Sequence, residues 1–234
     1  LAEFVEIFFA ARFDAIIAAT PFICDRFLKI NRNTININNY PLLNELHQSE
    51  TLHARKNQVC YLGGITEIRG IEILINACEH IQGKLVLAGK FSSFELENKV
   101  KSLPGWKNVN YIGFVDRETA KNFLAESRAG IITFLPEPNH INAQPNKMFE
   151  YMSVGTPIIS SDLEVLREVL VDRHNSLLVK PEDVNEWLIA LNLLTKDKNL
   201  AKRLGSNAYK DFVEKYTWEI RAKRMLEDIT INKK

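Results

Sequence analysis

Cysteine is scarce in this chain, and the three that occur lie far apart. Cys24, Cys60 and Cys78 form no CxxC pair, so neither a metal site nor a disulfide framework is expected. Widely spaced thiols suit a reducing compartment. The sequence also lacks an apolar run long enough to span a membrane, and no signal peptide opens it. These absences favour a cytoplasmic protein.

An excess of charge of either sign is also missing. The 234 residues carry 30 Lys and Arg against 29 Asp and Glu, a formal net charge of +1. This balance gives no electrostatic footprint for nucleic acid, so no nucleic-acid partner is expected. The length exceeds one minimal domain and falls short of two full ones. The first residue is Leu, as expected for a piece of a longer protein.

From about residue 57, strand-like and helix-like segments alternate. Continuous apolar runs without polar alternation are typical of strands buried on both faces of a parallel sheet. Such runs predict strands at 59–63, 85–88, 109–113, 130–134, 157–160 and 177–179. Amphipathic stretches such as RGIEILINACEHI lie between them. The tail from about Val184 is helical, with Thr217 as the expected N-cap of its last helix. The alternation predicts an α/β fold with a doubly wound parallel sheet.

The first fifty or so residues read as the end of another domain. EFVEIFFAARF predicts a helix and DAIIAAT a strand; Thr20 and Pro21 form an N-cap and first-turn pair for the next helix. TININNYP predicts a short strand, and LNELHQSETLHARKN a polar linker. We therefore predict that residues 1–54 hold the last elements of an amino-terminal domain plus the linker. Residues 55–234 then form a Rossmann-like domain with carboxyl-terminal helices.

The stretch AQPNKMFEYMSVGTPIISSD (residues 143–162) contains the first candidate site. The helix NKMFEYM follows the strand-like IITFLP, so it begins at the carboxyl edge of the sheet, where ligands of such folds bind. Its free N–H groups and positive dipole end suit phosphate oxygens. Lys147 adds a charge there, and Glu150 can accept hydrogen bonds from a diol such as ribose. The same spacing also fits a solvated ion pair worth about 0.2–0.5 kcal/mol.

Two further stretches place groups at the same edge. In YLGGITEIRGIEILINAC, Gly63 and Gly64 permit close backbone approach, and Arg69 can reach the crevice, although a surface arginine fits equally. In NVNYIGFVDRETA, the backbone of residues 113–115 can pair with a base edge or form a plain connecting loop.

Together these stretches resemble the carboxyl-terminal, donor-binding half of retaining glycosyltransferases of the GT-B fold, glycosyltransferase family 4, and most of all the bacterial enzymes of surface and capsular polysaccharide synthesis. KLVLAGKF, PNKMFEYMSVGTPIISSD and KYTWEIRAKRMLEDI follow in the family's order, and the similarity covers about residues 12–230.

The resemblance implies sugar transfer, with retention and without a metal or other cofactor, from a nucleotide sugar to a glycan or lipid-linked acceptor. A UDP-sugar is expected ahead of a GDP-sugar, at the inner face of the membrane or in the cytoplasm. Arg69, Lys147 and Glu150 are the implied catalytic residues. The implied substrate-binding residues are Gly63, Gly64, Gly113, Phe114, Val115, Asn142, Asn146 and Met148.

Two features depart from the family pattern. Asn142 stands where the family has the first of two glutamates, and Gly64 where many members have arginine. Most of the amino-terminal acceptor domain is missing, so this chain alone is expected to bind donor without efficient transfer. The alternatives are a non-catalytic binding partner or half-enzyme that needs a separate acceptor domain and, with less support, a nucleotide-sugar epimerase, for which no acid–base pair is found.

Overall fold

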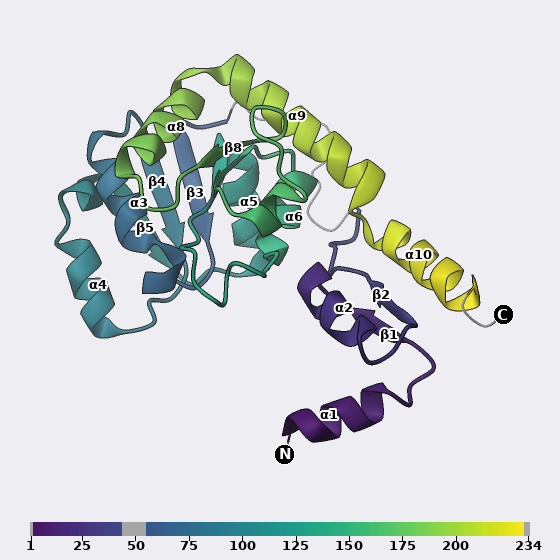
Figure 1. Ribbon diagram of the computed structural model, residues 1–234. Helices are drawn as coiled ribbons and strands as arrows, with labels where there is room; N and C mark the ends of the chain where they lie inside the picture. Colours follow the sequence, from purple (N-terminus) through teal and green to yellow (C-terminus); the bar gives the residue numbers. More distant parts are fainter. Residues whose placement is uncertain (1, 44–54, 232–234) are drawn as a thin grey trace.

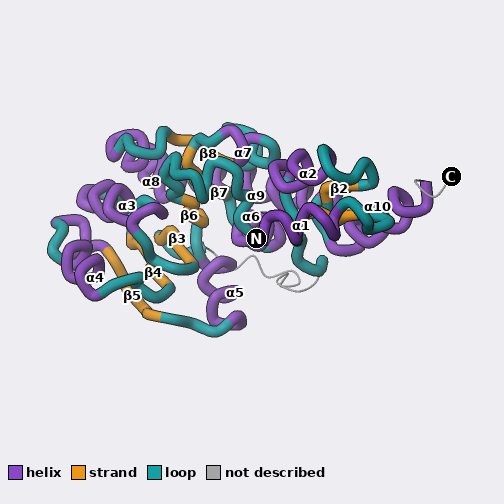
Figure 2. Tube along the Cα trace, turned by 60° about the horizontal axis from the view of Figure 1, so that its bottom comes forward, coloured by secondary structure: helices purple, strands orange, loops and turns teal. Residues whose placement is uncertain are grey.

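A six-stranded parallel sheet forms the centre of the protein. The computed structural model describes residues 2–43 and 55–231 (Figure 1), and the strands of this sheet follow the order β5-β4-β3-β6-β7-β8 (Figure 2). Their bounds are β3 (Gln58–Leu62), β4 (Lys84–Ala88), β5 (Val109–Gly113), β6 (Ala129–Ile132), β7 (Ile158–Ser161) and β8 (Ser176–Val179). The order runs outward in both directions from β3 and β6, so the predicted doubly wound α/β fold is confirmed. Each predicted strand lies within two residues of its observed bounds.

Helices cover both faces of this sheet. One face carries α3 (Ile71–Ala77), α4 (Phe94–Lys101) and α8 (Val184–Lys196). The other carries α5 (Arg117–Glu126), α6 (Asn146–Ser153), α7 (Glu164–Arg167) and the second half of α9 (Lys198–Lys215). Short 3₁₀ helices span Glu67–Arg69, Cys78–His80 and Pro104–Asn108. On β3, Val59 and Tyr61 enter one core and Cys60 enters the other, which explains the unbroken apolar pattern of the strands.

Close packing sets the position of α6. A Cβ atom at Gly130 of β6 would lie 2.4 Å from the ring of Tyr151 on α6, so only glycine lets the ring rest on the strand. On its other side, a Cβ atom at Gly205 of α9 would lie 2.2 Å from the carbonyl oxygen of Gly155. The helix is therefore held between the sheet and α9 at backbone contact distance.

The amino-terminal elements form a small separate sheet. They are α1 (Ala2–Ala10), β1 (Ile16–Ala18), α2 (Pro21–Leu28) and β2 (Thr34–Asn36), with β1 and β2 paired in parallel. Thr20 Oγ1 accepts from the N–H of Ile23, and Pro21 opens α2, as predicted. Of the predicted linker, residues 44–54 lie outside the described part of the chain.

The last helix, α10 (Trp218–Ile231), returns to this small sheet, as Figure 1 shows. Thr217 caps it, accepting at 3.3 Å from the N–H of Ile220, which confirms the predicted N-cap. The Trp218 N–H donates to the Pro41 carbonyl at 3.2 Å, and Arg224 reaches the Asn36 carbonyl at 3.4 Å. The last helix is thus joined to the end of the small sheet and to the segment that follows it.

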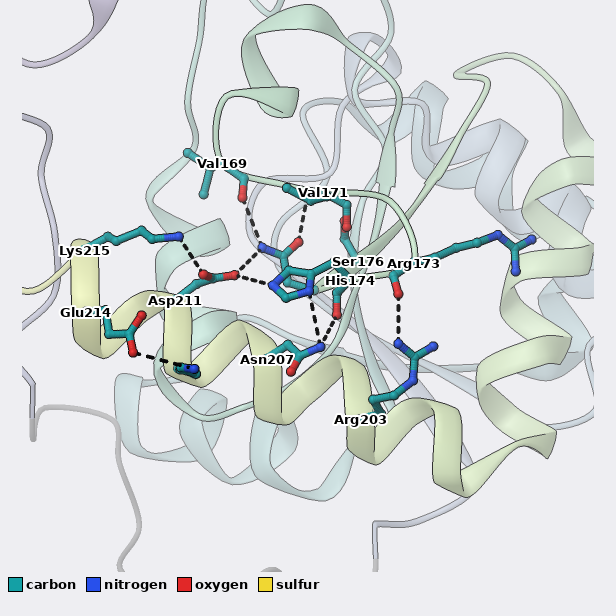
Figure 3. A network of polar contacts seen from close by, with 12 residues as sticks. Val169, Val171, Arg173, His174, Ser176, Arg203, Asn207, Asp211, Glu214 and Lys215 are labelled. Atoms are coloured by element: carbon teal, nitrogen blue, oxygen red, sulfur yellow. Dashed lines mark hydrogen bonds and ion pairs between the residues drawn. The ribbon is translucent and has the colours of Figure 1, made fainter.

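A polar network fixes the turn before β8 to α9 (Figure 3). Asp211, on α9, accepts from the side chains of Asn175 at 2.9 Å and Lys215 at 2.7 Å, and His174 lies 3.2 Å away. These partners hold the pKa of the Asp211 carboxyl below its usual range despite its burial. The Asn175 amide also holds the backbone of Val169 and Val171. The network lies at the amino end of β8 and holds the turn before this strand against α9.

A single arginine joins the carboxyl ends of α5 and α6. Burial lowers the pKa of Arg55, yet its guanidinium makes five hydrogen bonds of 2.6–3.2 Å. The acceptors are the carbonyls of Leu124, Ser127, Val154 and Gly155 and the hydroxyl of Thr156. Last-turn carbonyls have no intrahelical partner, so this side chain satisfies several of them at once.

We predict that Arg55→Lys destabilises the protein by about 2–4 kcal/mol, because an ammonium cannot reproduce the planar fork and leaves buried carbonyls unpaired. Urea unfolding followed by circular dichroism measures the loss. Lys56→Met is the matched control, since Lys56 forms only an exposed ion pair with Glu126, worth about 0–1 kcal/mol. Equal midpoints for Arg55→Lys and the wild type would refute the role given to Arg55.

Candidate functional site

A cavity of about 350 Å³ opens at the carboxyl edge of the sheet, between α5 and α6. Its volume lies in the range of sites for small organic ligands. The end of β3 and the segment after β6 form its floor. The lining residues are Leu62, Gly63, Arg69, Arg117, Ala120, Lys121, Leu124, Phe134, Pro145, Asn146, Lys147 and Glu150. We call this cavity the cleft.

Lys147 is the most unusual group in the cleft. The residue is partly exposed, but Nζ is buried and has no hydrogen-bond partner among the described residues, 2–43 and 55–231. The amine lies 4.2 Å from the centroid of the Tyr61 ring and 5.5 Å from that of Phe134. Aromatic faces attract a cation, but they do not replace the hydrogen bonds that an ammonium makes in water. An anion bound beside Lys147 Nζ would supply those hydrogen bonds.

Burial, followed by the nearby charge of Arg69, lowers the pKa of Lys147 to about 7. Glu150 acts in the opposite direction and does not offset the burial. The amine is therefore close to half-protonated at neutral pH, and a bound anion would favour its charged form.

Arg69 reaches the cleft from the end of the first 3₁₀ helix. Its Nη1 donates to the carbonyl oxygen of Gly64 at 3.1 Å, and its own carbonyl accepts from Thr133 at 2.5 Å. Gly70 follows with φ of 64°, and a Cβ atom there would lie 2.6 Å from the Thr133 carbonyl oxygen. Glycine is needed at this position, and it forms the N-cap of α3, directly after the 3₁₀ helix that ends at Arg69.

The first turn of α6 faces the cleft without a side-chain cap. Pro145 occupies the N-cap and makes no side-chain hydrogen bond to the turn. Asn146 and Lys147 line the cleft from this turn, and Glu150 lines it one turn further along. The helix end adds a partial positive charge. The cleft thus combines a helix N-terminus, four basic side chains and a carboxylate, which together suit a phosphate joined to a diol.

The structure brings together Gly63, Arg69, Asn146, Lys147 and Glu150 from the predicted set. Five other predicted residues are near this edge of the sheet but do not line the cleft: Gly64, Gly113, Phe114, Val115 and Asn142. The side chain of Phe114 is 74% exposed, and Lys90 Nζ lies 5.3 Å from its ring centroid.

The prediction that Met148 contacts a ligand is wrong for its side chain. Met148 is fully buried in the core between the sheet and α9, because helical periodicity turns it away from the face that carries Lys147. His140 is buried too, stacked on Phe134 with ring centroids 4.0 Å apart. Its place is in the packing behind the cleft, and burial lowers the pKa of His140.

The sequence analysis missed Arg117 and Lys121, which line the cleft from α5. They stand four positions apart on one helical face, directly after the strand end at Gly113. The reasoning that identified α6, a helix beginning at the carboxyl edge, applies equally to α5 and would have found them.

Two features are absent from the described residues: a metal-binding cluster and a membrane-spanning helix. In the ranges 2–43 and 55–231, no three His, Cys, Asp or Glu side chains are grouped in a way that could hold a metal ion. Within the same ranges, no helix has the length and apolarity needed to cross a membrane.

Comparison with known proteins assigns the family. Residues 44–211 match the family described as "Glycosyl transferases group 1". The chain belongs to the group 1 glycosyl transferases. This part of a group 1 glycosyl transferase is 29% identical over 173 residues to an uncharacterized glycosyltransferase of Methanocaldococcus jannaschii, covering 72% of this chain and 43% of that protein. It is 25% identical over 170 residues to the phosphatidyl-myo-inositol mannosyltransferase of Mycolicibacterium smegmatis, covering 69% and 42%.

Solved structures support the same fold for this glycosyl transferase chain. Anabaena HepE, determined in complex with UDP, superposes with a TM-score of 0.79 at 20% identity, over 97% of this chain and 66% of that one. Sucrose-phosphate synthase from Thermosynechococcus elongatus gives 0.77 at 22% identity, over 96% and 59%. The chain spans only 43%, 44% and 51% of three M. jannaschii relatives.

We predict that Lys147→Met stabilises the group 1 chain at neutral pH. The folded pKa of about 7 lies below the ordinary 10.5, so between these values the unfolded state binds more protons and stability rises with pH. Methionine removes this penalty, so the variant gains about 2–4 kcal/mol at pH 7 and less as the pH approaches 10. Urea unfolding at several pH values tests this.

Lys107→Met, which removes an exposed lysine, controls for the change in net charge. The account of Lys147 fails if the difference between wild type and Lys147→Met is the same at pH 7 and pH 10, or if the variant is less stable at neutral pH.

Proposed function

We propose that this chain is the donor-binding half of a retaining, metal-independent glycosyltransferase of family 4. In this proposal the enzyme transfers a sugar from a nucleotide donor to a glycan or lipid-linked acceptor of bacterial surface polysaccharide. The observation that carries it is the buried, unpartnered amine of Lys147, which lies beside Arg69 at the N-terminus of α6. That arrangement lacks an anion, and a nucleoside diphosphate supplies one.

In this proposal each group has a task. Lys147, Arg69 and the N–H groups of α6 hold the diphosphate, whose negative charge grows as the sugar leaves. Preorganised cations in a partly dry cleft stabilise that charge. Glu150, one turn along α6, accepts hydrogen bonds from the ribose hydroxyls. The acceptor hydroxyl attacks the anomeric carbon from the face that the diphosphate leaves, and the configuration is retained.

The base lies beyond the ribose, toward the end of β5. Gly113 has φ of 70° and open space where a Cβ atom would be, so the backbone of Gly113, Phe114 and Val115 can approach a planar ring. Gly64 and Asn142 then lie on the sugar side. HepE and the Staphylococcus aureus protein TarM were both determined with UDP, which supports UDP over GDP as the carrier here.

The amino-terminal elements belong, in this proposal, to the acceptor domain, with the boundary near residue 54. Large apolar side chains on this part are exposed: Phe4, Val5, Ile7, Phe8, Phe9, Phe13, Ile17, Phe22, Ile23 and Leu28. Contiguous apolar faces of this kind are normally covered. Because the matched relatives are about twice as long, we propose that further chain of the acceptor domain covers this face.

Calorimetric titration with UDP tests the donor site. We expect one UDP to bind per folded chain, and Glu150→Ala or Arg69→Ala to weaken binding about ten- to hundredfold, since each removes a hydrogen bond to a charged group. Above pH 7, binding should draw a proton onto Lys147, visible as a dependence of the heat on buffer ionisation. Lys147→Arg should bind without that proton.

Lys107→Ala is the control for lost charge and should bind UDP as the wild type does. Absence of binding by UDP, GDP and ADP to chain shown to be folded would end the proposal.

The acceptor-domain assignment has its own test. We expect the 234-residue chain to bind an apolar dye and to self-associate in light scattering, and Phe4→Ser/Phe8→Ser/Phe9→Ser to reduce both. A longer product that includes the remaining acceptor domain should stay monomeric and dye-free. Equal dye binding by the short and long products would contradict the assignment.

The second candidate is a donor-binding partner without transfer activity. Asn142 cannot carry the charge of a carboxylate, and it does not line the cleft. Mixing the chain with a separate acceptor domain decides between the two functions: restored transfer supports the enzyme, and binding without transfer supports the partner.

A further inference from the structure

The carboxylate assigned to the ribose already has a charged neighbour across the cleft. Arg117 Nη2, on α5, lies 3.7 Å from Glu150 Oε1, on α6. The arginine side chain is 58% exposed and the glutamate 30%. Both residues line the cleft, so the pair connects its two walls.

The local sequence fixes where Arg117 stands. Asp116 caps α5, and its carboxylate accepts at 2.8 Å from the N–H of Thr119. Arg117 is the first helical residue, immediately after the segment 113–115 at the end of β5. It is therefore placed between the proposed base site and the proposed ribose site.

Glu150 has competing cations nearby. Lys147 lies one turn earlier on the same helix, and the charge of Glu150 raises the pKa of its amine. A carboxylate that turned toward Lys147 would neutralise the cation meant for the diphosphate. Arg117 attracts Glu150 toward α5 instead, and a planar guanidinium restrains the orientation of a carboxylate better than a point charge does.

We propose that Arg117 is a positioning residue for the nucleoside: by pairing with Glu150 across the cleft, it turns this carboxylate toward the ribose diol and away from Lys147. The inference rests on the proposed function, because it concerns the same donor site. It gives α5 a part in donor selectivity, as the wall that selects ligands with an intact 2′,3′-diol.

A comparison of UDP with 2′,3′-dideoxy-UDP tests the role. In the wild type, loss of the diol should weaken binding about ten- to hundredfold, because charge-assisted hydrogen bonds are lost. Arg117→Ala should weaken UDP binding about two- to fivefold, the range that an exposed ion pair allows, and should leave the binding of dideoxy-UDP unchanged. Arg117→Lys should restore part of the preference for the diol.

A double-mutant cycle separates positioning from direct contact. In the Glu150→Gln background, Arg117→Ala should have no further effect on UDP, since the two residues act as one unit. Lys107→Ala repeats the change of net charge away from the cleft and should affect neither ligand.

The outcomes are distinct. Equal weakening of UDP and dideoxy-UDP by Arg117→Ala would show that Arg117 contacts the phosphates or base directly and would overturn the positioning role. Tighter UDP binding by Arg117→Ala would show that the arginine competes with the ribose, which also overturns it. If wild-type chain binds neither nucleotide, the proposed function itself fails, and the inference fails with it.

Discussion

The packing of α6 against the sheet is the constraint on which the cleft depends. Gly130 lets the Tyr151 ring lie directly on β6, and Gly205 lets α9 pack closely against Gly155, just after the carboxyl end of α6. With Met148 and Phe149 also buried, the inward face of α6 has one orientation. Because a helix turns 100° per residue, that orientation forces Lys147 and Glu150 onto the face that borders the cleft. Their positions thus follow from core packing.

This packing buries the amine of Lys147 near the charge of Arg69 without a hydrogen-bond partner among the described residues. An amine without partners, buried beside a second cation, disfavours the native state. Side chains elsewhere in the protein show the opposite arrangement: Asp211 is buried among Asn175, His174 and Lys215 (Figure 3), and Arg55 meets five acceptors. The unpartnered amine of Lys147 is one reason to take the cleft as the candidate site.

The sequence predicted the fold well because the sheet is buried on both faces. Unbroken apolar runs mark such strands regardless of their neighbours, and all six lie within two residues of the prediction. Caps at Thr20 and Thr217 were also predicted, since capping depends on local chemistry. The site was predicted in part. Lys147 and Glu150 follow from one helix, but the burial of Nζ depends on Tyr61 in β3 and on Phe134 in the segment after β6.

Side-chain direction explains the remaining differences. Met148 was assigned to the ligand by its place in a motif, and only the packing of α6 against α9 shows that it points into the core. The pairing of Arg117 with Glu150 could not be predicted, because the two residues are 33 positions apart on different helices. Pairings of that kind depend on how two helices lie side by side on the sheet, which periodicity along one segment does not report.

The two helices that bound the cleft are joined at both ends. Arg55 binds carbonyl groups at the carboxyl ends of α5 and α6, and Arg117 meets Glu150 at the cleft. The first connection is buried and made of many hydrogen bonds, so it fixes the spacing of the helices. The second is exposed and weak, so a ligand can rearrange it without moving either helix. In the proposed function, rigid spacing with an adjustable side-chain contact would let the cleft admit a nucleotide while the groups assigned to its phosphates stay in place.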